Sequence, residues 1–128
     1  MTKEEVVAHW VESSDSDSAV MESLFSNDHY SWSLFVGHLV VEKMLKAHYA
    51  ANKDANVPRT HNLTRIAAMS ELPLSEAQED FLDEVTTFNI DARYTDEKDR
   101  FHKKATKEFT GKYIKEIKEF CEWLKESI

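Results

Sequence analysis

The stretch Phe35-Val36-Gly37-His38-Leu39-Val40-Val41-Glu42-Lys43-Met44-Leu45-Lys46-Ala47 decides the fold of this chain. It forms the middle of a longer segment in which apolar side chains occupy most of the helical circumference instead of a single stripe. Such a helix cannot present a broad side to water, so it lies at the centre of a bundle or partly in a subunit interface. The stretch therefore predicts a central helix from about Tyr30 to Ala51.

The composition indicates that the rest of the chain is helical too. The chain has 128 residues and 41% hydrophobic content, enough for one core and not for two. It contains only two glycines and two prolines, too few for the frequent tight turns of an all-β fold. We expect a single all-α domain over residues 1–128.

Capping signals and apolar periods locate the other helices. Thr2 with Glu5, and Ser75 with Gln78, have the spacing of capping boxes, and Thr60 is a candidate N-cap. The run 13–18, rich in serine and aspartate, is expected to be the exposed middle of a weak first helix. The expected helices around the central one cover about 2–25, 61–69, 75–92 and 102–125.

Charge is distributed unevenly along the chain, whose net charge is −8. Residues 71–91 hold seven acids and no base, whereas residues 98–118 hold eight bases and three acids. The basic segment could attract phosphate or an acidic partner, although the overall charge opposes tight non-specific binding to nucleic acid. It could equally be a solvated helix face with compensating acids nearby.

Several classes of protein are excluded or disfavoured by what the sequence lacks. Cys121 is the only cysteine, so it can form no internal disulfide, and we expect it to be packed rather than reactive. No apolar signal-peptide core and no 18-residue apolar run occur, so we expect a cytoplasmic protein without a membrane span.

His38 and Glu42 lie one helical turn apart, but the paired Glu-x-x-His pattern of a bundle metal site is missing. We therefore expect no metal and no cofactor.

Four segments in this order carry a resemblance to a known family: Trp10, the segment 30–47 with its Glu-Lys-x-Leu-Lys-Ala ending, Thr60-His61-Asn62-Leu63, and Arg93-Tyr94. With them the chain resembles the HEPN domain family (higher eukaryotes and prokaryotes nucleotide-binding), in particular the subgroup often encoded beside minimal nucleotidyltransferases. The resemblance implies an antiparallel up-and-down four-helix bundle with a short additional helix, and commonly a homodimer.

The chain departs from the ribonuclease members of that family. Those members resemble one another in carrying an arginine, about four to six residues and then a histidine at a helix start. Here Arg59 and His61 are separated by one residue, and Arg93 and His102 by eight. Thr95 also stands where a proline usually follows the Arg-Tyr pair. The pair Arg93 and His102 is the remaining candidate for a catalytic cation and base, if the chain folds so as to bring them together.

A second set of residues is suited to holding a ligand. Arg93, Tyr94 and Asp96 offer a forked donor for phosphate, a ring for stacking and an acceptor. The motif matches add Lys43, Lys46, Arg59 and His61. Each has a structural alternative: Lys46 could pair only with Glu42 one turn away, His61 could satisfy local backbone groups, and Arg93 could pair with a nearby aspartate.

The leading hypothesis is a non-catalytic module that binds a nucleotide or nucleotide-bearing substrate, as a homodimer and as an accessory to a nucleotidyltransferase. Two alternatives remain open. One is a metal-independent ribonuclease toxin that uses Arg93 and His102, and the other is a pure protein-interaction domain.

Overall fold

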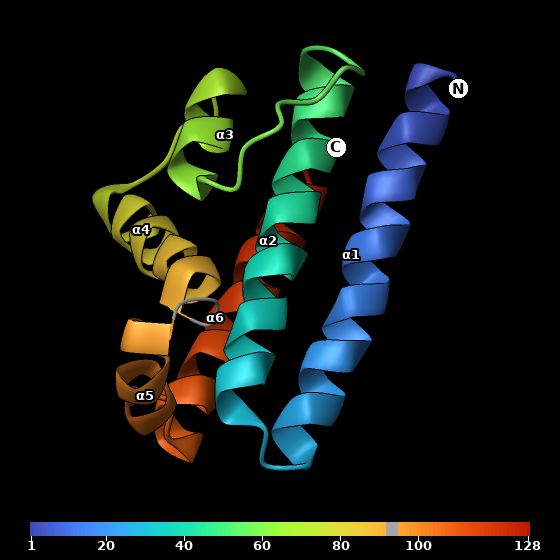
Figure 1. Ribbon diagram of the computed structural model, residues 1–128. Helices are drawn as coiled ribbons and strands as arrows, with labels where there is room; N and C mark the ends of the chain where they lie inside the picture. Colours follow the sequence, from blue (N-terminus) through green and yellow to red (C-terminus); the bar gives the residue numbers. More distant parts are fainter. Residues whose placement is uncertain (92–94) are drawn as a thin grey trace.

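The protein is all-helical in the computed structural model, which describes residues 1–91 and 95–128, with the side chains of all of these except 90 and 95–97. The described residues form six helices and no strand (Figure 1), which confirms the predicted fold class. The helices are α1 (Lys3–Ser26), α2 (Tyr30–Asn52), α3 (Leu63–Met69), α4 (Glu76–Asp91), α5 (Thr95–Lys104) and α6 (Lys107–Lys125).

Helix α2 is the centre of the bundle. The four longer helices α1, α2, α4 and α6 alternate in direction, and α3 and α5 flank the two ends of α4 (Figure 1). Helix α2 contacts all of the other five, and more than half of its 23 residues are buried. Its apolar circumference is thus covered on several sides by neighbouring helices, as the sequence predicted.

Two buried serines join α1 to α2. The hydroxyl of Ser14 donates a 2.7 Å hydrogen bond to the carbonyl oxygen of Val40, and that of Ser33 donates a 2.8 Å bond to the carbonyl of Met21. The expectation that the whole serine-rich run is exposed is wrong at Ser14, which is 1% exposed. A small hydroxyl can be buried there because the neighbouring helix offers it an acceptor.

Gly37 permits the close approach of α2 to α6. A Cβ at Gly37 would lie 2.7 Å from Cδ1 of Ile117 and 3.2 Å from Sδ of Met21, the first of which is closer than real Cβ contacts come. At Gly111 of α6 an added Cβ would meet only Phe25, at an ordinary 3.5 Å. Of the two glycines, Gly37 is therefore the one at which an added methyl group would need a neighbouring side chain to shift.

Both predicted capping boxes form. Glu5 N–H donates to the Thr2 hydroxyl at 3.1 Å, and Thr2 N–H donates to the Glu5 carboxylate at 3.2 Å. Ser75 and Gln78 make the same reciprocal pair at 3.1 and 2.9 Å. Local signals of this kind are correctly predicted because all their partners lie within one turn.

Two helix starts differ from the prediction. Helix α3 begins at Leu63 rather than His61, because Asn62 and not Thr60 provides the cap, accepting from Arg65 N–H at 3.1 Å. The segment expected to open one long last helix at His102 instead ends α5. Helix α6 begins at Lys107, where the Thr106 hydroxyl accepts from Phe109 N–H at 3.2 Å.

Among the described residues, no helix is both long enough and apolar enough to cross a membrane.

Candidate functional site

Glu42 is the centre of a buried polar cluster on α2. Its side chain is 6% exposed, and its two oxygens bind different partners. Oε2 accepts a 3.1 Å hydrogen bond from Nζ of Lys46, one turn further along the helix, and Oε1 lies 2.8 Å from Nδ1 of His61. The carboxylate is thereby paired with the ammonium of Lys46 and hydrogen-bonded to the His61 ring, as burial of a charge requires.

His38 ties the backbone of the α2–α3 loop to the same cluster. Its Nε2 lies 2.9 Å from the carbonyl oxygen of His61 and 3.9 Å from Oε1 of Glu42. A carbonyl oxygen only accepts hydrogen bonds, so Nε2 of His38 carries the hydrogen. The side chain of His38 is fully buried, whereas that of His61 is 57% exposed. His61 is therefore fixed to the central helix while its ring remains open to solvent.

A cavity of about 370 Å³ lies beside this cluster, between α1, α2 and the loop that follows α2. Its lining includes His9 and Trp10 of α1, Lys46 of α2, and Val57, Pro58 and Arg59 of the loop. Its volume is at the lower end of the range for small-molecule sites, about 300–1,000 Å³. The cavity is therefore large enough for a ligand that consists of one ring with a short polar group attached.

The cavity combines an aromatic surface with positive charge. Nζ of Lys46 lies 5.4 Å from the ring centre of Trp10, within cation–π range, and the ring centres of His9 and Trp10 lie 5.3 Å apart in a T-shaped arrangement. Lys46 is already neutralised by Glu42, but exposed Arg59 has no hydrogen bond or ion pair with any described residue. The free guanidinium of Arg59 therefore gives the cavity its uncompensated charge.

The structure brings together three of the sequence-predicted ligand residues and separates a fourth from them. Lys46 and Arg59 both line the cavity, and His61 lies two residues beyond Arg59, bonded to Glu42. Lys43 instead lies against α1, where its Nζ is 2.6 Å from Asp17. Lys43 is thus engaged in joining α1 to α2.

Three of the remaining predicted site residues lie wholly or partly outside the part of the chain that the structure describes. Arg93 and Tyr94 lie outside the described residues, and the side chain of Asp96 does too. His102 is exposed on α5, where it shares a hollow of about 290 Å³ with Tyr30 and Trp32 of α2.

The basic segment is partly compensated by the protein's own acids. Lys104 pairs with Glu84 at 2.7 Å, Lys118 pairs with Glu22, and Lys98 lies 5.5 Å from the ring centre of Trp32. The interpretation as a solvated helix face with nearby acids therefore fits Lys104 and Lys118.

Sequence reasoning missed the role of Glu42 as a partner of His61. The pair Glu42 and Lys46 was recognisable from its spacing of one turn, but His61 is 19 residues away along the chain. His38 and Glu42 lie one turn apart on α2, a spacing that metal ligands also have. Among the residues that the structure describes, no cluster of three or more histidine, cysteine or acidic side chains could hold a metal ion.

Two titratable groups away from the cluster are changed by burial. Burial raises the pKa of the Cys121 thiol to about 12, so the thiol stays protonated and unreactive near neutral pH. Burial also lowers the pKa of His48, which favours its neutral form. Neither group lines the cavity.

These features define an all-α bundle protein with a buried polar cluster on its central helix and a small, positively charged aromatic cavity beside it. The chain belongs to the HEPN domain family, because the family model matches residues 7–127. No match was found among curated proteins or among solved structures.

Proposed function

We propose that this HEPN domain is a non-catalytic module that binds a nucleotide, or the nucleotide portion of a larger substrate, in the cavity between Trp10, Lys46 and Arg59. The observation that carries the proposal is the unpaired guanidinium of Arg59 beside the Trp10 ring in one cavity. A guanidinium binds phosphate oxygens through a planar fork of donors, and an indole offers a face for a base.

The two basic side chains of the cavity have different roles in this proposal. Arg59 is the phosphate contact, since its charge is not used elsewhere in the described chain. Lys46 is neutralised by Glu42 and lies over Trp10, so its role is to hold the ring in place. The ligand therefore depends more on Arg59 than on Lys46.

The polar cluster positions the loop that carries Arg59. His61 is bound twice to α2, once through its ring to Glu42 and once through its carbonyl to His38. Because residue 61 is fixed, residue 59, two positions earlier in the same loop, has less freedom to move. The loop therefore loses less conformational entropy when a ligand orders it. His61 acts in this account as a positioning residue.

A nucleotide panel in thermal unfolding tests the proposal. A ligand that binds only the folded state stabilises it by RT ln(1 + [L]/Kd), about 2.7 kcal/mol at a hundredfold excess over Kd. We expect at least one nucleotide to raise the unfolding temperature, with inorganic phosphate giving a smaller rise. If no nucleotide raises it at millimolar concentration, the proposal is wrong.

The resemblance to the nucleotidyltransferase-associated subgroup extends the proposal to partners. We infer that the chain forms a homodimer and presents its bound nucleotide to a nucleotidyltransferase. Sedimentation velocity checks the dimer, and co-purification with a nucleotidyltransferase checks the partner.

The proposed module performs no chemistry, which separates it from the ribonuclease alternative. The alternative predicts that purified protein cleaves RNA without metal and that His102→Ala abolishes the cleavage. Under the present proposal the protein leaves RNA intact.

A further inference from the structure

The charges around the cavity between α1, α2 and the following loop limit how much phosphate it can receive. Of the described residues that line it, Lys46 and Arg59 are the only lysine and arginine, and none is an aspartate or glutamate. Nζ of Lys46 lies 3.1 Å from a carboxylate oxygen of Glu42, so its charge is already compensated inside the protein. The described wall therefore offers a ligand one permanent positive charge, the guanidinium of Arg59.

One guanidinium matches one phosphate group. Its planar fork of donors binds two oxygens of the same phosphate at once. Each further phosphate of a nucleoside di- or triphosphate adds negative charge, for which the described lining has no lysine or arginine left. Because the whole chain has a net charge of −8, this added charge is repelled rather than compensated.

A metal ion shared between protein and ligand does not change this balance. In phosphate sites Mg²⁺ is usually bound by one or two carboxylates of the protein together with the phosphates of the substrate. The described lining of the cavity contains no carboxylate, and the nearby carboxylate of Glu42 is engaged by Lys46 and His61. A triphosphate would therefore bring its Mg²⁺ to the cavity without gaining a carboxylate ligand for it.

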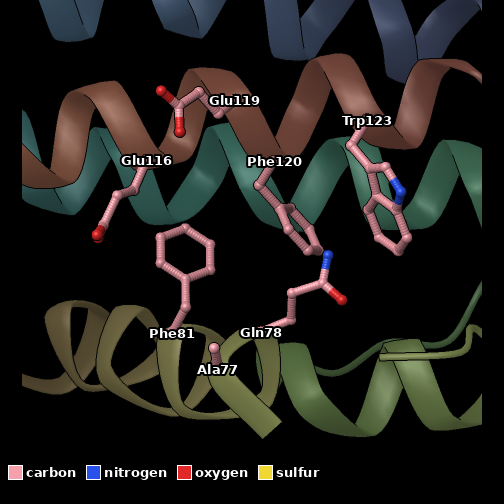
Figure 2. A pocket seen from close by; sticks show the side chains of 7 residues that line it. All are labelled: Ala77, Gln78, Phe81, Glu116, Glu119, Phe120 and Trp123. Carbon is pink, nitrogen blue, oxygen red and sulfur yellow. The ribbon is translucent and has the colours of Figure 1, made fainter. Parts of the chain in front are cut away.

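An aromatic hollow between α4 and α6 provides a contrast. Phe81 of α4 and Trp123 of α6 line this hollow of about 330 Å³ (Figure 2). The charged side chains in its described lining are those of Glu116 and Glu119, which repel a phosphate. The nucleotide cavity differs from this hollow in combining a ring with positive charge, so charge is the property by which it selects a ligand.

We propose that the cavity selects a nucleoside monophosphate over the corresponding di- and triphosphates, with Arg59 binding the one phosphate and the ring of Trp10 facing the base. The inference rests on the proposed function, since it names the class of nucleotide that the same cavity takes. It adds an order of preference that nucleotide binding alone does not require, because affinity falls as phosphates are added.

Isothermal titration of the full chain with the mono-, di- and triphosphates of adenosine, guanosine, cytidine and uridine tests the inference. The titrations are made at low salt with EDTA and repeated with Mg²⁺. In EDTA we expect the monophosphate of the best-bound nucleoside to bind at least about fivefold more tightly than its triphosphate, with the diphosphate between them. Added Mg²⁺ should not make the triphosphate the tighter ligand. The difference should shrink at high salt, because it arises from charge repulsion.

A matched pair of variants tests whether the cavity itself sets this preference. Ala55→Lys adds a cation at an exposed residue that lines the cavity, and Ala68→Lys adds the same charge at an exposed residue of α3 that does not. We expect Ala55→Lys to shift the ratio of the two affinities at least about threefold towards the triphosphate, and Ala68→Lys to leave the ratio within about twofold of that of the unmodified chain.

The inference and the proposed function fail on different results. The inference alone is wrong if nucleotides bind but the triphosphate binds as tightly as the monophosphate in EDTA, or more tightly with Mg²⁺. It is also wrong if the two variants shift the ratio equally, since the overall charge of the chain would then set the preference. If none of these nucleotides binds, the proposed function fails and the inference fails with it.

Discussion

Nδ1 of His61 lies 2.8 Å from Oε1 of Glu42, so a histidine of the α2–α3 loop is fixed to a carboxylate buried in the central helix. Because Glu42 also binds Lys46, one carboxylate joins the loop, the helix and the wall of the cavity. We therefore expect both the stability of the fold and the shape of the proposed site to depend on Glu42.

Replacing Glu42 by glutamine should destabilise the protein by about 3 kcal/mol, because Lys46 would be left as a buried charge without a counter-charge. Side-chain volume and most hydrogen bonding are kept, so the loss reports mainly on charge. Urea unfolding of both proteins at the same pH measures the difference.

Lys43→Gln is the matched control on the same helix. Its ion pair with Asp17 is about a quarter exposed at each end, so its loss should cost about 1 kcal/mol or less. Equal costs for Glu42→Gln and Lys43→Gln would show that Glu42 has no special place in the fold.

Alanine substitution at the two glycines should separate packing from helix propensity. Gly111→Ala should stabilise the protein by up to about 1 kcal/mol, because its new methyl group meets only ordinary contacts. Gly37→Ala gains the same propensity but forces Ile117 and Met21 to move, an overpacking cost of about 1–3 kcal/mol.

Thermal or urea unfolding of the two variants provides the comparison. The expected order of stability is Gly111→Ala, then the unmodified chain, then Gly37→Ala. If Gly37→Ala were the most stable of the three, the overpacking of the new methyl group against Ile117 and Met21 would be contradicted.

The buried thiol of Cys121 should make stability fall at high pH. Its folded pKa of about 12 lies above the usual value for an exposed thiol, so the folded state keeps a proton that the unfolded state loses. The free energy of unfolding therefore decreases from about pH 9 towards pH 12, by at most about 1.4 kcal/mol per pH unit.

Cys121→Ala isolates this contribution, because lysine and tyrosine titrations are common to both proteins. Urea unfolding at a series of pH values should give a shallower decline for the variant, although its stability at pH 7 is lower. Parallel declines would contradict the assignment.

Features with local causes were predictable from the sequence, and features with distant causes were not. The central helix follows from the apolar circumference of 35–47, and the caps at Thr2 and Ser75 have their partners within one turn. The burial of Ser14 depends on a carbonyl 26 residues away, which no local pattern encodes.

The break between α5 and α6 shows a different limit. Ala105 and Phe109 continue a helical apolar period through it, and neither glycine nor proline marks the boundary. Only the capping hydroxyl of Thr106 identifies the new helix, and threonine also occurs inside helices.

The candidate site was predictable to a similar extent. Lys46, Arg59 and His61 were selected from the family motifs, and the fold places them around one cavity and its supporting cluster. Lys43 belongs to the same motif, but the rotation of α2 directs it towards Asp17 of α1. The periodicity of the sequence predicts which residues share a face of a helix. It does not predict which neighbouring helix or loop contacts that face.

Isothermal titration of the best-binding nucleotide into three proteins tests the central claim most directly: the unmodified chain, Arg59→Gln and Arg65→Gln. Arg65 is an exposed arginine of α3 that does not line the cavity, so its replacement makes the same change of charge elsewhere. We expect Arg59→Gln to weaken binding at least about tenfold, consistent with the loss of one charge-assisted contact, and Arg65→Gln to bind as the unmodified chain does. Equal affinity of all three proteins would contradict the account.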